Sequence, residues 1–166
     1  RNAEVGPDLG RGPGKGRQER REFMDSLGLN GRVLANKFPK VLDYLPQYIA
    51  RHMAGLTVLG LDAVKVINLN PNLLGDADTT TAERIAYLND QTIDAVTVIN
   101  SFPTIAGNSI ETLQAKIDNL TNLGLDAATF INRNPVALGY SEASVRAKAE
   151  NLKALGLAPS IIFETF

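Results

Sequence analysis

The sequence predicts an all-α protein, an α-solenoid built from 32-residue repeats with two helices and a 3₁₀ turn in each repeat. Three features lead to this prediction. Prolines recur every 32 residues, a Leu-Gly-Leu triplet recurs with the same period, and an Asn or Asp directly follows that triplet. The prolines are Pro39, Pro71, Pro103 and Pro135, and the triplets begin at Leu27, Leu59, Leu123 and Leu155. Self-similarity at a period of this size is typical of stacked helical units.

Each repeat is expected to begin with a short helix. An Asn or Asp before a short apolar run can accept hydrogen bonds from the free N–H groups of a helix start. The helix must end near the proline, because proline disfavours the α conformation in the residue before it. The predicted N-caps are Asn30, Asp62, Asp94 and Asp126. The predicted buried pairs are Leu34/Ala35, Val66/Ile67, Val98/Ile99 and Phe130/Ile131.

A 3₁₀ turn and a longer second helix are expected after each proline. An apolar residue followed by Gly or Asp comes shortly after the proline and favours one tight turn. The second helix has apolar residues at offsets of three and four, which share one helical face. Residues 80–83 and 108–111 are predicted capping boxes at its start. The apolar stripes are Ile49, Met53 and Leu56; Ile85 and Leu88; Leu113, Ile117 and Leu120; Val145, Ala149 and Leu152.

A glycine is expected to end the second helix in the left-handed conformation, with the following leucine packing back on the helix. The residues at this position are Gly28, Gly60, Gly124 and Gly156, with Thr92 in the remaining repeat. A β-branched residue in the left-handed region costs about 1–2 kcal/mol. The junction at Thr92 is therefore either strained or formed by another kind of turn.

The sequence divides into a tail and a repeat domain. Residues 1–22 are rich in glycine and include Arg11, Lys15 and Arg17, so we expect a flexible basic tail. Residues 23–166 are expected to form the helical repeat domain, with about four and a half repeats. A fifth repeat opens at Leu155, with Pro159 in its first helical turn and Phe166 at the position of Phe38 and Phe102. The end of the chain is thus either a cut solenoid or a half-repeat that acts as a cap.

Composition excludes several classes of site. There is no cysteine, which excludes disulfides and thiolate metal sites, and His52 is the only histidine. No run of 18 apolar residues is present, so we expect no membrane span. We also expect no metal, no cofactor and no enzyme activity, because no motif combines a nucleophile, a base and an orienting group.

The repeat resembles that of the mitochondrial transcription termination factor (mTERF) family. The resemblance rests on a short helix closed by proline, a leucine three residues later, a second helix and the Leu-Gly-Leu junction. It covers residues 24–166 and is best at residues 59–74 and 123–138. It implies a superhelix whose groove binds duplex DNA or structured RNA, with roles in organellar transcription or ribosome assembly. It also implies a mitochondrial or plastid location if the source is eukaryotic.

One column of basic residues is the candidate nucleic-acid site. His52, Arg84, Lys116 and Lys148 each stand thirteen residues after a repeat proline, and Arg20 lies in the same register. Equal positions in a solenoid form a line, and a line of cations can follow a phosphate backbone. The alternative is a solvated helix face, since Lys and Arg are good helix formers and Glu83, Asp118 and Glu150 lie nearby.

A second column consists of asparagines three residues before each proline, namely Asn36, Asn68, Asn100 and Asn132. Their amides could read bases or bind a partner backbone. The alternative, which we favour, is that each amide satisfies carbonyl groups left open at the end of the first helix.

Two functions remain open. The first is a monomeric nucleic-acid-binding module, with Arg84, Lys116 and Lys148 as the main contacts. The second is a protein-interaction scaffold that holds a peptide, or a ribosomal or transcription partner, in the same groove. From Phe23 onward the chain has 11 basic and 14 acidic residues, which weakens binding that depends on phosphate neutralisation. The chain could also be one segment of a longer array whose other repeats carry most of the charge.

Overall fold

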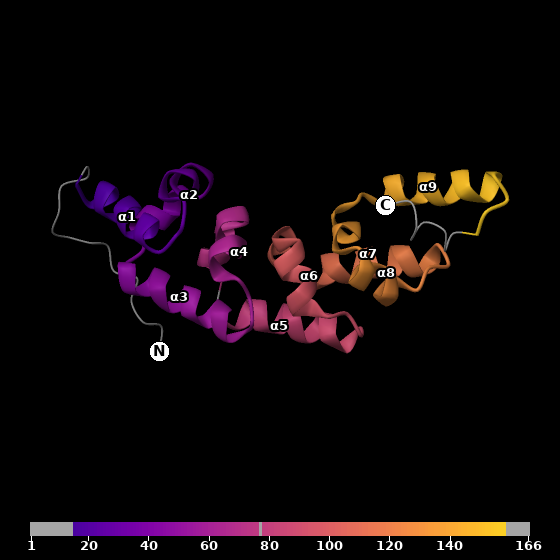
Figure 1. Cartoon of the computed structure of the whole chain (residues 1–166), viewed down its shortest axis with the longest axis horizontal. Helices are drawn as coiled ribbons and strands as arrows, with labels where there is room; N and C mark the ends of the chain where they lie inside the picture. The colour runs from indigo at the N-terminus through magenta and orange to yellow at the C-terminus, as the bar shows by residue number, and fades with distance from the viewer. Residues whose placement is uncertain (1–14, 77, 159–166) are drawn as a thin grey trace. The chain divides into compact units, whose positions relative to one another are not determined.

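A computed structural model describes residues 15–76 and 78–158, and over these residues the protein is all-helical with no β-strand (Figure 1). The all-α prediction is therefore confirmed. The chain divides into two compact units, Arg1–Thr81 and Ala82–Phe166. The division falls inside the region that the sequence assigns to one repeat domain, and each unit is described by itself below.

The N-terminal unit alternates long and short helices. Each short helix is followed by a five-residue 3₁₀ helix that begins at a proline. The elements are α1 (Lys15–Ser26), α2 (Gly31–Lys37), η1 (Pro39–Asp43), α3 (Pro46–Val58), α4 (Ala63–Leu69) and η2 (Pro71–Gly75). Helix α5 (Asp78–Asp90) contains the division between the units.

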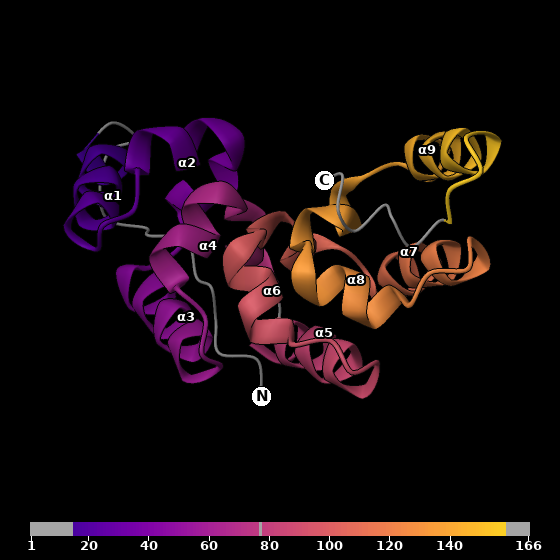
Figure 2. The same ribbon diagram turned by 45° about the vertical axis from the view of Figure 1, so that its right-hand side comes forward.

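The C-terminal unit continues the same alternation. Its further elements are α6 (Ala95–Ser101), η3 (Pro103–Gly107), α7 (Ile110–Asn122), α8 (Ala127–Arg133), η4 (Pro135–Gly139) and α9 (Glu142–Ala154). Within this unit α8 lies beside α7 (Figure 2). The long and short helices thus pack as pairs, with η4 directly after the short helix of its pair.

The short helices begin and end where the sequence predicts. The side chains of the four expected N-cap residues each accept a hydrogen bond from the backbone N–H three residues later, as in Thr97 N to Asp94 Oδ1 at 3.1 Å. Each helix ends two residues before the proline. The predicted apolar pairs, from Leu34/Ala35 to Phe130/Ile131, are all buried and form the core against the long helices.

The junctions after the long helices are left-handed, as predicted. Gly28, Gly60, Gly124 and Gly156 have φ values of 80°, 86°, 81° and 75°. Thr92 has a φ of 60° and is the one residue other than glycine with positive φ in the described part of the chain. The alternative that this junction adopts another turn is therefore wrong, and the backbone there carries the strain expected of a β-branched residue.

The predicted tail is partly wrong. Residues 15–22 belong to α1, so Lys15 and Arg17 are helical. The helix forms because Met24 is fully buried and anchors it to the core, and Gln18 Nε2 donates a hydrogen bond to Glu22 Oε1 one turn later at 2.9 Å. The rest of the tail, residues 1–14, and the fifth-repeat positions in residues 159–166 lie outside the described residues.

The predicted capping boxes are also placed differently. Ser109 is the N-cap of α7 and its hydroxyl accepts from Thr112 N at 3.2 Å, so the cap lies one residue later than expected. Residues 80–83 lie inside α5, which begins at Asp78. Runs of Ser, Thr and Asn offer more than one capping register, and sequence alone does not choose between them.

Three kinds of feature are not found in the described residues. No single helix there is long and apolar enough to span a membrane, and only the pair α3 and α4, bent by 115°, would meet that test together. No group of three or more His, Cys, Asp or Glu side chains in this part of the chain could hold a metal ion.

Candidate functional site

The predicted cation column is largely turned away from solvent. Arg20 and His52 are buried, with 8% and 4% of their surface exposed. Arg84 and Lys116 are half-buried, and Lys148 is exposed. A side chain that contacts phosphate in a groove needs an accessible charge, and only Lys148 among the five predicted residues presents one openly.

The half-buried members of the column contact backbone carbonyl groups instead. In the C-terminal unit Arg84 Nη1 donates to the carbonyl oxygen of Ala106 at 2.5 Å, and Lys116 Nζ donates to that of Tyr140 at 3.4 Å. Ala106 lies in η3 and Tyr140 directly follows η4, where the last carbonyls have no partner within the helix. Each cation therefore joins its long helix to the 3₁₀ helix that comes next along the chain.

A hydroxyl group makes the corresponding contact in the N-terminal unit. Tyr48 Oη donates to the carbonyl oxygen of Leu74, in η2, at 3.2 Å. Leu74 precedes Ala106 by one 32-residue period. The bond from the long helix to the 3₁₀ helix is thus retained although the donor is a different residue type at a different position.

His52 belongs to a row of rings in the N-terminal unit. Its ring lies 6.0 Å from that of Tyr48 and nearly parallel to it, and Tyr48 lies 4.9 Å from Tyr44. Tyr44 in turn lies 6.0 Å from Phe38. Burial, followed by the charges of Tyr48 and Asp43, raises the pKa of Tyr44 above its ordinary value. These packed rings fill the interior and give His52 a structural position.

The asparagine column connects consecutive junctions. Asn132 Nδ2 donates to the carbonyl oxygen of Thr92 at 3.0 Å, and its Oδ1 accepts from Asp94 N at 2.8 Å. Asn68 makes the same pair of bonds to the carbonyl oxygen of Gly28 and to Asn30 N, at 3.3 and 2.8 Å. The structural interpretation of Asn68 and Asn132 therefore holds, but their partners lie 38 to 40 residues earlier rather than at the end of their own helix.

A groove between α7 and α9 is a feature that the sequence interpretation missed. It encloses about 370 Å³ and has buried apolar residues at its base and exposed carboxylates at its edge. The base includes Leu120, Ala137 and Val145, and the edge includes Glu111 and Glu142. A volume of this size lies within the range of natural binding pockets.

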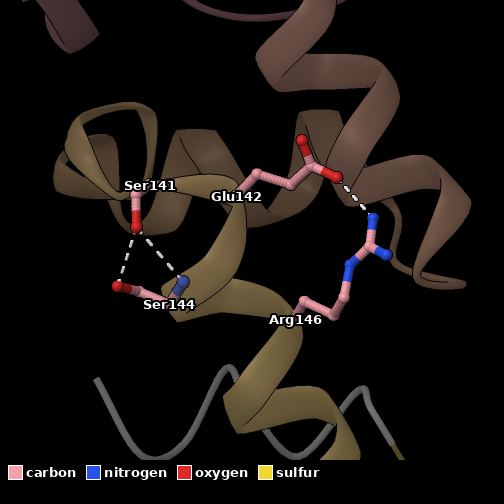
Figure 3. A network of polar contacts seen from close by, with 4 residues as sticks. All are labelled: Ser141, Glu142, Ser144 and Arg146. Atoms are coloured by element: carbon pink, nitrogen blue, oxygen red, sulfur yellow. Dashed lines mark hydrogen bonds and ion pairs between the residues drawn. The ribbon is translucent and has the colours of Figure 1, made fainter.

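The edge of the groove is held by helix caps and one ion pair (Figure 3). Ser141 caps α9 by accepting from Ser144 N at 3.2 Å, and Glu142 is paired with Arg146 one turn later. Glu111 is fully exposed. Hydrogen bonds from its own backbone N–H and, second, from the Ser109 hydroxyl lower the pKa of Glu111 below its ordinary value of 4.5. Glu111 therefore remains ionised at neutral pH.

The signal that could have revealed the groove is a change of side-chain size within the 32-residue register. Asn119 stands one period after Tyr87, and Glu142 stands one period after Ile110. At both positions a large side chain is replaced by one that fills less of the interior, and Asn119 and Glu142 both line the groove.

Comparison with known proteins adds no further assignment. No family model, no curated protein and no solved structure matches the chain. The functional proposal therefore rests on the arrangement of the described residues.

Proposed function

We propose that the chain is an α-solenoid of mTERF-like 32-residue repeats that holds a segment of a partner protein in a groove between successive long helices. The recurrence of the elements supports the solenoid. The short helices α4, α6 and α8 begin at Ala63, Ala95 and Ala127, and the 3₁₀ helices that follow begin at Pro71, Pro103 and Pro135. The paired bonds of Asn68 and Asn132, with equal sequence offsets in the two units, support it further.

The observation that carries the choice of a protein partner is the use of the cation column. Arg84 and Lys116 direct their charges to backbone carbonyls within the protein. Carbonyls that already accept these bonds would lose them if the same side chains turned to phosphates, and an unsatisfied part-buried polar group costs about 1–3 kcal/mol. The groove between α7 and α9 instead offers apolar surface edged by carboxylates, which repels a polyanion and suits a protein segment.

Nucleic acid is the second candidate. Lys148 is exposed on α9, and Arg146 and Lys153 are exposed on the same helix. These side chains, together with the resemblance to mTERF repeats, favour contact with phosphates at the C-terminal end of the described chain. Binding through so few cations would be weak and strongly dependent on salt.

Both candidates can be tested on the full chain in parallel. Short random peptides displayed on phage are selected against the immobilised protein, and the enriched peptides are titrated by fluorescence anisotropy. Labelled duplex DNA and a labelled RNA hairpin are titrated in the same buffer over a series of salt concentrations. We expect peptides to bind and both nucleic acids to bind weakly or not at all. Tight nucleic-acid binding that falls steeply with salt, with no peptide enriched, would replace the protein proposal by the second candidate.

A further inference from the structure

The groove between α7 and α9 owes its apolar space to small side chains on α7. Ala115 and Asn119 line it, on the face of α7 that turns toward α9. One 32-residue period earlier in the C-terminal unit these positions are Glu83 and Tyr87. Tyr87 is half-buried, so at that position an aromatic ring covers interior surface that Asn119 leaves open.

The base of the groove is suited to one apolar side chain. Leu120, Ala137 and Val145 line it and are buried within the protein. Lys116 also reaches this space, but its ammonium group donates to the carbonyl oxygen of Tyr140. Its alkyl stem therefore adds apolar surface, while its charge is directed to the protein backbone.

The charge of the edge points to a basic neighbour on the occupant. Arg146 is already paired with Glu142 (Figure 3). Glu111 is exposed and ionised, and it forms no ion pair within the described residues. An approaching Lys or Arg therefore gains a partner at Glu111, whereas an approaching carboxylate meets like charge.

A second cavity extends the groove along the two helices. It encloses about 260 Å³ and shares Asn119 and Glu142 with the first. It is lined mainly by polar and charged residues, including Asn122, Glu150 and Lys153. A continuous groove with an apolar part and a polar part is longer than one side chain requires, and it fits an extended or helical peptide segment better than a compact small molecule.

We propose that the α7–α9 groove binds a peptide segment of a partner protein, with one large apolar side chain over Leu120 and Val145 and a Lys or Arg beside Glu111. This deepens the proposed function and rests on it, because it names the site and the chemistry of the segment that the repeats would hold. The polar part of the groove receives the following residues of the segment.

The test uses the full chain and two groove variants. The probes are displayed peptide libraries with a fixed Leu or Phe flanked by either basic or acidic residues. Asn119→Tyr places in the groove the ring that the preceding period has at Tyr87, and Ala115→Leu fills the same space if the tyrosine variant fails to fold. Glu111→Gln removes the edge charge, and Asp90→Asn is the matched charge control on an exposed site outside the groove.

We expect the basic-flanked library to be enriched on the wild type. A peptide from it should lose at least roughly tenfold in affinity on the filled variant, and about two- to fivefold on Glu111→Gln, as exposed ion pairs contribute modestly. Asp90→Asn should bind like the wild type. Enrichment that survives Asn119→Tyr and Ala115→Leu would overturn this site while leaving the protein-binding function in place. Preference for acidic flanks would overturn the proposed chemistry, and enrichment of neither library would overturn both proposals.

Discussion

The side-chain amide of Asn132 donates a hydrogen bond to the carbonyl oxygen of Thr92, 3.0 Å away, across 40 residues of sequence. Thr92 has a left-handed backbone with φ of 60°. The same amide accepts from Asp94 N through its Oδ1, so one side chain holds both sides of a strained junction. Asn68 holds the junction at Gly28 in the same way.

Replacing Asn132 or Asn68 by alanine should destabilise the protein. Each change removes two hydrogen bonds, and because these bonds are exposed we expect a loss of about 1–2 kcal/mol in the free energy of unfolding. Urea denaturation followed by circular dichroism measures it. The matched control is Asn36→Ala, because Asn36 is exposed and forms no hydrogen bond with the described residues. Equal effects at Asn36 and Asn132 would refute the assigned role of the column.

Thr92→Gly should stabilise the protein by about 0.5–1 kcal/mol. Glycine removes the steric cost of the left-handed conformation, and the larger entropy of the unfolded glycine chain offsets part of this gain. The reciprocal change, Gly124→Ala, should cost about 1 kcal/mol, because a Cβ there meets no atom within 4 Å and only the backbone conformation opposes it. Thermal melting of both variants checks the pair, and a lower melting temperature for Thr92→Gly would contradict the strain.

Two glycines on helices should respond to alanine in opposite directions. A Cβ at Gly31 would lie 2.7 Å from the carbonyl oxygen of Arg21 in α1, so the backbone must move and we expect a loss of about 1–3 kcal/mol. Gly55 lies inside α3 with nothing within 4 Å of its Cβ position, so Gly55→Ala should gain about 0.5–1 kcal/mol. Chemical denaturation of the two variants measures both effects. A tolerated Gly31→Ala would show that α1 and α2 are not packed as described.

The cap of α8 should make stability depend on acid pH. Hydrogen bonds from the backbone N–H and then the hydroxyl of Thr129 lower the pKa of Asp126 below its ordinary value of 3.8. The ionised carboxylate therefore contributes stability above 3.8, and this contribution is lost as the pH falls through the lower pKa of the folded state. Asp126→Asn keeps a capping amide without the charge. The stability difference between wild type and Asp126→Asn should shrink between neutral pH and about pH 3, and a constant difference would contradict this account.

The sequence predicted the elements of the fold well because their signals are local. Caps such as Asp94, the prolines and the glycines of the left-handed turns act on the residues next to them, so their positions predict where helices begin and end. The start of α1 was missed, because residues 1–22 were read as one glycine-rich segment although Met24 anchors a helix that extends back to Lys15.

The direction in which each column faces was harder to predict. A shared period places Arg84 and Lys116 in one line, but it does not say whether that line meets solvent or the carbonyls of the next 3₁₀ helix. The same limit applies to Asn132, whose partners lie one period back. The groove depends on the absence of a ring at Asn119, and a missing side chain is visible in sequence only when the register is compared position by position.

The central claim is that the cation column stabilises contacts within the protein. Its most direct test is the free energy of unfolding in urea of the double variant Arg84→Met/Lys116→Met beside that of Lys148→Met. We predict that the double variant loses about 1–3 kcal/mol, because two part-buried carbonyls lose charged donors. Lys148→Met, at an exposed position, should stay within about 0.5 kcal/mol of the wild type. A double variant as stable as the wild type would contradict the claim and return Arg84 and Lys116 to the phosphate-binding interpretation.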